Sequence, residues 1–545
     1  MDCPEIQIEN GRLKGKVSEP DCSNAQPVYM YLSVPYGKST SGQRRFAPPE
    51  AAENWEGTLN ATETLTNCPQ NVGPTELYDQ MLPQKDSLNF DKNKSTEDCL
   101  RLSVFTPSTV KTSSLPVMVW LTGGHYERNF AGRVDGTAVS GMNNVVTVVV
   151  NFRVNVFGYL SLGKDSVCPG NLALQDVILA LKWVRQNIRA FGGNPENVTL
   201  FGESSGSGMV HLLMMSDLSK GLFHKAILLS GSTLSPFLCA EDTSAAGEAF
   251  LNALNIDKDI GEKQVLQELR NRSIEDLMSA QSVFNDFMRC MPTIDGHVLK
   301  DSPENLTKAG HVHRVPLLIG CTNSEGHGLI SATTYPDFFE GTAEENVKNM
   351  FQMTFNKIYK KGNAEEAFEM LKEAYLRDVP KDDPTRYSLL HGDMVSDSIF
   401  VIPTIMTAIA HTSMGLPTYL FQMTQQPQFN HDETNGPGVL KKPAFVKCDH
   451  ADDMHFVWGA PFVKGELPYG ARFTEDEKEL SRNVMTYFTN FAYTGNPNNG
   501  QEVPKEWPQY TLEEQNHMVL QTPLLNGQRL NQDKVVMYTQ KFPAL

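Results

Sequence analysis

Residues 202–206 read Gly-Glu-Ser-Ser-Gly, the pattern of a nucleophilic serine on a sharp turn between a strand and a helix. The apolar run 198–201 precedes the turn, and the helix-like segment 209–215 follows it. Glycine at both ends leaves room for a strained backbone, and the hydroxyl would stand over a helix N-terminus, which favours negative charge. The pattern predicts that Ser204 is a nucleophile. The alternatives are a Gly/Ser-rich turn without chemistry, or Ser205 as the nucleophile.

A serine hydroxyl is a weak nucleophile, so Ser204 needs a base, and the base needs an orienting acid. With this kind of turn, the acid and then the histidine follow the serine along the chain. Glu325 lies in the polar loop 320–326 after an apolar run, and His450 lies in the polar loop 448–453. Taken alone, Glu325 could be a solvated loop acid, and His450 is one of 13 histidines. Their order and setting make them the candidate acid and base.

An oxyanion formed during acyl transfer needs backbone N–H groups from a loop that follows an earlier strand. The apolar run 117–121 leads into residues 122–126, which read Thr-Gly-Gly-His-Tyr, and the two glycines allow close approach to a substrate. No Gly-Lys-Ser/Thr follows, so this is not a phosphate-binding loop. The sequence also lacks His-Glu-X-X-His and Cys-X-X-Cys, so we expect neither a metal nor another cofactor.

These segments need a sheet and helices to position them. Short apolar runs alternate with helical patterns, which is typical of an α/β fold with a mostly parallel sheet covered by helices. Helices are predicted over 174–191, which two glycines end, and from the capping box 474–477 to Gly495. We find no repeat and no long linker, so we expect one domain, residues 1–545, with long insertions. Further strands are predicted at 145–151, 226–229, 316–319 and 418–421.

The chain carries 47 Lys and Arg against 64 Asp and Glu, a formal charge of −17. An acidic surface does not attract phosphate, so nucleic acid is not an expected partner. No apolar run reaches the ~20 residues of a transmembrane helix. The composition therefore indicates a globular protein without a transmembrane segment.

Signals for the compartment point in opposite directions. The residues after Met1 contain neither the basic nor the apolar part of a signal peptide, which predicts a cytoplasmic protein unless Met1 replaces a removed leader. The nine cysteines are an odd number, so at least one is unpaired in a monomer. Glycan acceptor triplets instead indicate a secreted, extracellular protein, and they begin at Asn60, Asn93, Asn197, Asn271 and Asn305.

Several motifs in the right order make the chain resemble the type-B carboxylesterase/lipase family, which includes carboxylesterases, bile-salt-activated lipase and cholinesterases. The motifs are residues 97–100, 151–154, 191–195, 202–206, 450–459 and 495–497. The resemblance covers most of the chain. It implies the α/β-hydrolase fold and hydrolysis of a small-molecule or lipid ester through an acyl-enzyme. It also implies a catalytic triad of Ser204, Glu325 and His450.

The resemblance implies further features around the triad. An oxyanion hole would be built from the backbone N–H groups of Gly124, His125 and Ser205. A disulfide between Cys68 and Cys99 would close a loop over the active-site gorge. Two structural ion pairs are also implied, Arg45–Glu97 and Arg153–Asp176.

The family offers more than one kind of function. Residues 450–459 look most like bile-salt-activated lipase, so a lipase acting on long acyl chains is the alternative to a carboxylesterase. The loop between Cys68 and Cys99 has no tryptophan for cation–π binding of a quaternary ammonium, which argues against acetylcholine. The family also contains non-catalytic adhesion proteins, but these usually lack a triad residue, and this chain has all three.

Three positions near the nucleophile depart from the family pattern or admit two roles. His125 stands where the family often has glycine or alanine, and Ser205 where it has alanine. Either only the His125 N–H matters, or the imidazole lies at the mouth of the hole. There it would position water, slow bulky esters and help to hydrolyse a phosphylated Ser204. Glu203 either orients water or is a buried structural acid.

Overall fold

The computed structural model describes residues 3–72, 85–285, 288–335, 337–360, 362–432 and 440–544. The strands are β1 (Glu5–Ile8), β2 (Gly11–Lys14), β3 (Lys16–Ser18), β4 (Val28–Pro35), β5 (Thr58–Asn60), β6 (Arg101–Thr106), β7 (Leu115–Leu121), β8 (Val146–Val150), β9 (Gly193–Glu203), β10 (Lys225–Leu229), β11 (Leu317–Thr322), β12 (Thr418–Met423), β13 (Asn516–Leu520) and β14 (Leu525–Gln528). The apolar runs found in the sequence correspond to β7 through β12.

The α-helices lie between these strands and after them. They are α2 (Thr137–Asn143), α3 (Asn155–Tyr159), α4 (Leu172–Asn187), α5 (Ser205–Met214), α6 (Ser244–Ala253), α7 (Glu262–Asn271), α8 (Ile274–Ser279), α9 (Pro303–Lys308), α10 (Leu329–Thr334), α11 (Glu344–Tyr359), α12 (Ala364–Tyr375), α13 (Arg386–Val395), α14 (Ile402–Ser413), α15 (Met454–Val457), α16 (Glu475–Thr494) and α17 (Gln532–Val536).

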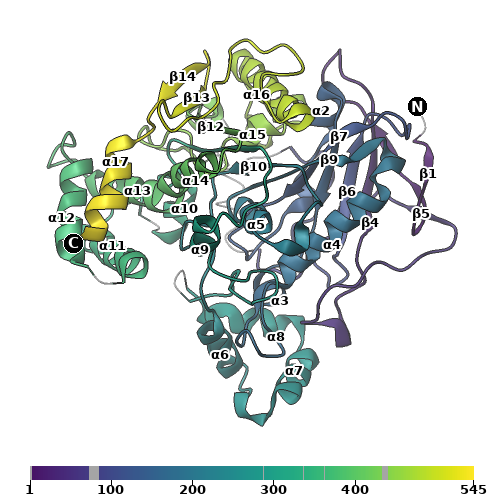
Figure 1. Cartoon of the computed structure of the whole chain (residues 1–545), viewed down its shortest axis with the longest axis horizontal. Helices are drawn as coiled ribbons and strands as arrows, with labels where there is room; N and C mark the ends of the chain where they lie inside the picture. Colours follow the sequence, from purple (N-terminus) through teal and green to yellow (C-terminus); the bar gives the residue numbers. More distant parts are fainter. Residues whose placement is uncertain are drawn as a thin grey trace.

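An 11-stranded sheet forms the centre of the molecule, in the order β14-β13-β12-β11-β10-β9-β7-β8-β6-β4-β3. A second sheet has the order β1-β2-β5. Neighbouring strands of the large sheet are parallel from β8 to β13, and the pairs at both edges are antiparallel. Helices flank this sheet (Figure 1), so the predicted α/β architecture with a mostly parallel sheet is confirmed.

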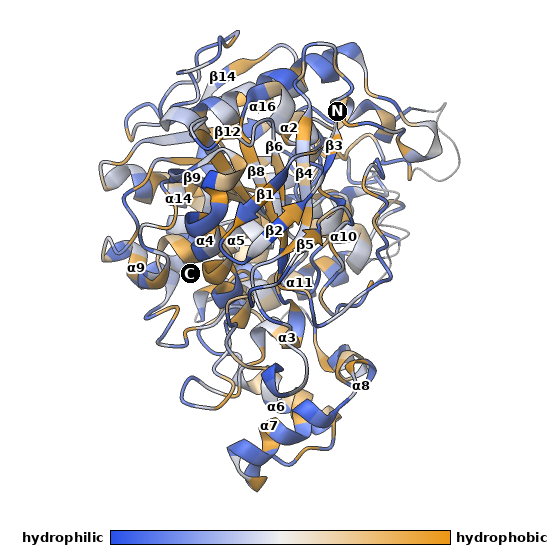
Figure 2. Ribbon diagram, turned by 90° about the vertical axis from the view of Figure 1, so that its right-hand side faces the viewer, coloured by the Kyte–Doolittle hydropathy of each residue, from blue (hydrophilic) through white to orange (hydrophobic). Residues whose placement is uncertain are grey.

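Strand β7 shows how the sheet separates two hydrophobic cores. All 7 of its residues are buried, because helices cover both faces. Val117 and Val119 belong to the core that contains α4 and α5, whereas Met118 and Trp120 belong to the core that contains α16. This alternation follows from the period of two along a strand. Figure 2 shows the apolar strands inside and more hydrophilic segments around them.

The helix boundaries follow local signals in the sequence. Helix α4 is followed by a 3₁₀ turn and by Gly192, whose φ of 75° ends it. Helix α16 begins with the capping box of Thr474 and Glu477 and ends at Gly495, with φ 81°. Helix α5 begins at Ser205, four residues before the segment that the sequence indicated. The nucleophile turn passes directly into the helix, although glycine and serine are weak helix formers.

Two groups of helices extend beyond the sheet. Helices α6, α7 and α8 project at the lower end of the view, and α11, α12 and α17 gather around the C-terminus (Figure 1). Among the described residues, one helical run, Arg386–Ser413, is long and apolar enough to cross a membrane. In this run 78% of the most apolar window is buried inside the fold, as in a core helix of a water-soluble domain.

The expected covalent and ionic links are present. Cys68 and Cys99 form a disulfide, and residues 73–84 of the loop that it closes lie outside the described part of the chain. The other seven cysteines form no disulfide within the ranges that the structure describes. Both ion pairs have nitrogen–oxygen distances of 2.6 Å, Arg45–Glu97 and Arg153–Asp176.

The glycan acceptor triplets differ in accessibility. Asn197 is half-buried, its amide donates to the Tyr493 carbonyl at 3.3 Å, and Thr199 of the same triplet is fully buried. Asn197 is therefore less exposed than the other acceptor positions. The exposed acceptors are Asn60, Asn93, Asn271 and Asn305.

Candidate active site

Ser204 lies at the sharp turn between β9 and α5. Its backbone has φ 55° and ψ −125°, a strained conformation for a residue with a side chain. Its N–H donates to the Leu229 carbonyl at 2.9 Å, which ties the turn to β10. A Cβ at Gly206 would lie 2.1 Å from the Leu121 carbonyl oxygen, so only glycine lets α5 pass this close to β7. Contacts on both sides therefore hold the strained turn.

The side chains of Ser204, His450 and Glu325 form a hydrogen-bonded chain. His450 Nε2 is 3.0 Å from Ser204 Oγ, and His450 Nδ1 is 2.5 Å from Glu325 Oε2. The other oxygen of Glu325 accepts from the Ser230 hydroxyl at 2.5 Å and from the Thr322 N–H at 2.6 Å. Burial alone would raise the pKa of Glu325, but His450 and these donors hold it below its ordinary value. Glu325 is therefore a carboxylate at neutral pH.

Hydrogen bonds join the loops that carry Glu325 and His450. The side chains of Asn323 and Ser324 accept hydrogen bonds, each of 3.1 Å, from the N–H groups of residues 447–448. These bonds run between segments more than 120 positions apart in the chain. They hold the acid loop and the histidine loop side by side at the edge of the sheet.

A buried ion cluster supports the histidine loop, and sequence reasoning did not identify it. Lys442 Nζ lies 2.9 Å from Asp449 Oδ2 and 3.3 Å from Asp452 Oδ1, and all three side chains are fully buried. Asp449 also accepts the N–H groups of His450 and Leu329, each at 2.8 Å. The charge of Lys442 offsets the cost of burying two carboxylates. Asp449 thereby fixes the backbone at His450 and links it to the acid loop.

Glu203 contacts the same imidazole that contacts the serine. Its Oε1 lies 3.1 Å from His450 Nε2. Burial is the main reason that the pKa of Glu203 is raised to about 7. Burial alone would lower the pKa of His450, but the carboxylates of Glu203 and Glu325 outweigh it and raise that pKa to about 9. The two carboxylates thus stabilise the positive charge that the imidazole carries once it has accepted a proton.

Two further side chains surround the imidazole, and sequence reasoning missed both. Phe400 lies in a π-helical turn, residues 396–401, with its ring centre 4.7 Å from that of His450. Asp453 is buried, and in the described part of the chain neither of its carboxyl oxygens has a hydrogen-bond partner. Burial and the neighbouring glutamates raise the pKa of Asp453 well above its ordinary value, which favours its neutral form. A π-helical turn at such a site is common, but no sequence signal announced it.

The loop after β7 lies directly against Ser204. A Cβ at Gly123 would lie 2.9 Å from Ser204 Cβ, so the loop passes directly against the serine. Gly124 has φ 133° and His125 has φ 63°, which turns the loop back. Within the described ranges, no hydrogen bond uses the N–H groups of Gly124, His125 or Ser205. These donors stay available for a negatively charged oxygen, which is what an oxyanion hole requires.

The ring of His125 is accessible to solvent and is held by an arginine. Arg289, itself buried, donates to His125 Nδ1 at 2.6 Å. The protein atoms around His125 reduce its hydration, which disfavours the charged imidazole. This effect, followed by the positive charges of Arg289 and Arg128, holds the pKa of His125 well below its ordinary value. The imidazole is therefore neutral at physiological pH. Its action on a substrate stays a prediction.

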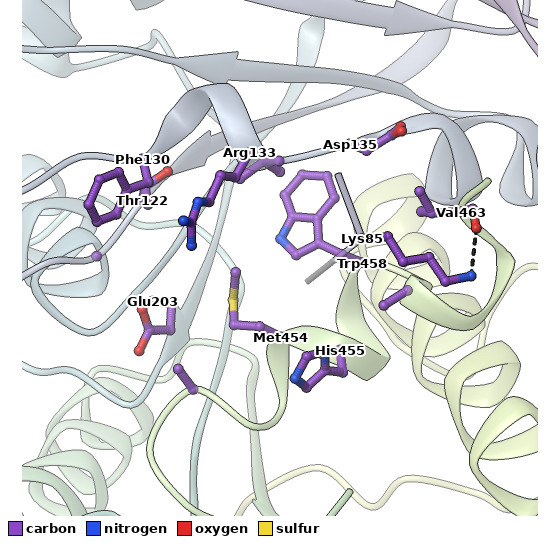
Figure 3. Close-up of a pocket in the computed structure, with 14 residues that line it drawn as sticks. Lys85, Thr122, Phe130, Arg133, Asp135, Glu203, Met454, His455, Trp458 and Val463 are labelled. Atoms are coloured by element: carbon purple, nitrogen blue, oxygen red, sulfur yellow. Dashed lines mark hydrogen bonds between the residues drawn. The ribbon is translucent and has the colours of Figure 1, made fainter. Parts of the chain in front are cut away.

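A small pocket opens beside Glu203 (Figure 3). Its cavity volume is about 90 Å³. Met454 and Trp458, four residues apart in the chain, both line the pocket, as do Phe130 and Arg133. The guanidinium of Arg133 is 5.2 Å from the centre of the Phe130 ring. Because Glu203 lies 3.1 Å from His450 and directly precedes Ser204 in the chain, this pocket adjoins the candidate triad.

Replacing Lys442 with methionine should strongly destabilise the protein, because Asp449 and Asp452 would be buried without their counter-charge. We expect the free energy of unfolding, measured by urea denaturation, to fall by about 3–5 kcal/mol. The matched control is Lys308→Met, which breaks the exposed Lys308–Glu304 pair of 2.6 Å and should leave stability nearly unchanged. Equal losses in the two variants would contradict the role of the buried cluster.

Comparison with known proteins agrees with the resemblance found in the sequence. The model described as "Carboxylesterase family" matches residues 2–537. The chain is 33% identical to carboxylesterase 5A of Homo sapiens, over 99% of this chain and 90% of that protein. It is 34% identical to carboxylesterase 1C of Mus musculus, over 98% and 93%, and 33% identical to cocaine esterase of Homo sapiens, over 94% and 87%. The chain therefore belongs to the carboxylesterase family and is a serine ester hydrolase.

Proposed function

We propose that the protein hydrolyses carboxylic esters in two acyl-transfer steps, with Ser204, His450 and Glu325 as its catalytic triad. The observation that carries this proposal is the hydrogen-bonded chain of 3.0 Å and 2.5 Å that runs from Ser204 through His450 to Glu325. A fold alone does not assign such roles. The geometry supports them because nucleophile, base and orienting acid lie within hydrogen-bond reach of one another.

In the first step, Ser204 Oγ attacks the ester carbonyl carbon while His450 Nε2 takes the hydroxyl proton. The electron pair of the carbonyl moves to its oxygen, where the N–H groups of Gly124, His125 and Ser205 bind the anion. The intermediate then collapses, the bond to the alcohol oxygen breaks, and the alcohol leaves with the proton from His450. Ser204 is left carrying the acyl group.

In the second step, a water molecule attacks the acyl-enzyme. His450 takes a proton from the water, the ester bond to Ser204 breaks, and the proton passes to Ser204 Oγ as the carboxylic acid leaves. Glu325 stays ionised and stabilises the imidazolium through Nδ1. Glu203 Oε1, 3.1 Å from Nε2 of the same ring, adds negative charge on the other side. Both carboxylates favour the protonated imidazole that each step forms.

The pocket beside Glu203 supports an ester that is small on one side of its carbonyl. A cavity of about 90 Å³ is small beside the roughly 300–1,000 Å³ of typical small-molecule pockets. One substituent of the ester then has room for only a few heavy atoms. This favours a carboxylesterase of compact esters over a lipase that needs long chains.

Ser204→Ala should remove ester hydrolysis, since loss of the nucleophile from a triad typically costs about 10⁴–10⁶-fold. The measurement is the rate with a short-chain p-nitrophenyl ester. Ser216→Ala is the matched control, because it removes a buried hydroxyl that donates to the Val298 carbonyl at 2.7 Å, just beyond α5. This control should keep its activity. Substantial hydrolysis by Ser204→Ala would show that another group is the nucleophile.

Glu203→Gln should move the acidic limb of the pH profile of kcat/KM to lower pH. The carboxylate of Glu203 stabilises protonated His450, and His450 must lose its proton before it can act as a base. Removing that negative charge lowers the pKa of His450, so the enzyme stays active further into acid. Glu196→Gln, on the exposed start of β9, should leave the profile unchanged. A shift toward higher pH in Glu203→Gln would refute the proposed coupling.

Two series of esters separate a carboxylesterase from a lipase. In one, the acyl chain lengthens on a fixed p-nitrophenol; in the other, the alcohol lengthens on a fixed acetyl group. We expect kcat/KM to fall in one series beyond about three or four carbons, where the pocket is full. If rates rise toward long chains in both series and depend on bile salt, the lipase is the better description.

A further inference from the structure

The hydroxyl of Ser205 takes no part in the acyl transfer described above, yet it contacts the loop after β7. Ser205 Oγ accepts a hydrogen bond from the Tyr126 N–H at 3.2 Å, and both residues are buried. Ser205 follows the nucleophile as the first residue of α5, and Tyr126 follows His125. The bond therefore joins the two segments whose N–H groups face the proposed oxyanion.

The loop after β7 needs such a link because its backbone is strained. His125 and Tyr126 both have φ 63°, the left-handed conformation that side chains disfavour. Such residues keep this conformation only where their surroundings enforce it. If the loop relaxed toward ordinary backbone angles, the N–H groups of Gly124 and His125 would turn away from Ser204.

Other contacts hold Tyr126 but leave its N–H to Ser205. The Tyr126 carbonyl accepts from the Asn155 N–H at 2.6 Å, and the Tyr126 hydroxyl donates to the Leu238 carbonyl at 2.7 Å. The Tyr126 N–H belongs to the peptide unit that begins at His125. By accepting from it, Ser205 Oγ fixes the plane of that peptide unit and with it the direction of the loop at His125.

We propose that the Ser205 hydroxyl is a positioning group that holds the loop after β7 in its active geometry. This proposal rests on the proposed function and deepens it. Ser205 then acts twice: its N–H binds the oxyanion, and its Oγ aligns the N–H groups of Gly124 and His125. Aligned donors stabilise the transition state more than the bound substrate. The hydroxyl should therefore affect kcat far more than KM.

The test is Ser205→Ala, which keeps the backbone N–H and removes only the acceptor oxygen. We expect kcat to fall roughly 10-fold, less than the loss of a whole oxyanion donor, with KM within about twofold of wild type. Affinity for an aryl trifluoromethyl ketone should weaken by about the same factor as kcat. The ketone adds to the nucleophile and places an anionic oxygen in the hole, so it mimics the transition state.

Two other substitutions at the same position sharpen the test. Ser205→Thr keeps an acceptor oxygen and should recover most of the kcat and of the ketone affinity. Ser205→Cys is close in shape but its sulfur is a weak acceptor, so it should lie between wild type and the alanine variant. If the alanine variant does not fold, the cysteine variant replaces it in the test.

Ser216→Ala, near the other end of α5, is again the control and should bind the ketone as wild type does. The proposal is overturned if the alanine or cysteine variant binds the ketone as tightly as wild type. It is equally overturned if affinities for ketone and substrate fall together. Failure of the proposed function itself would look different, because wild type would then form no ketone adduct and Ser204→Ala would still hydrolyse esters.

Discussion

The active site depends on one close approach, that of α5 to the ends of β7 and β10 at the nucleophile turn. A Cβ at Gly202 would lie 2.6 Å from the Gly206 carbonyl carbon, and a Cβ at Gly231 would lie 2.3 Å from the Ser204 carbonyl oxygen. No side chain fits at such distances. Because these positions are glycine, the chain can turn sharply enough to hold Ser204 at the edge of the sheet, within 3.0 Å of His450.

Around that turn, several acids share one imidazole but differ in charge. Glu325 accepts two hydrogen bonds besides the one from His450, and these contacts hold its pKa low. Asp453 has no such partner in the part of the chain that the structure describes, and its pKa is raised well above the ordinary value. Glu203 has an intermediate pKa, raised to about 7. The donors that reach each carboxyl group, rather than its residue type, decide which acid is charged.

The parts of this site that could be predicted from the sequence are those with local causes. The turn at 202–206, the strand before it and the capped helix α16 each follow from neighbouring residues, and the order of the candidate acid and histidine follows from the kind of turn. The parts that could not be predicted come from contacts across the chain. Arg289 contacts His125 from 164 positions away in the chain, and Lys442 and its acidic partners lie in a segment with no periodic pattern.

Short strands such as β1 to β3 could not be predicted either, because three or four residues show too little alternation of apolar and polar side chains to be recognised.

The pocket of Figure 3 draws much of its wall from outside the sheet, from Lys85, from the loop 130–135 and from the segment 451–463, and Glu203 at the end of β9 completes it together with residues 122–123 after β7. Ser204 directly follows β9, and Glu325 lies three residues beyond the end of β11. Part of the pocket wall, Lys85 and the loop 130–135, therefore comes from segments that carry no residue of the proposed triad. Substitutions in these wall segments can therefore accumulate during evolution without changing the residues of the proposed triad. Relatives that share only 33% identity can then differ in the esters that they accept and still keep the same hydrolytic mechanism.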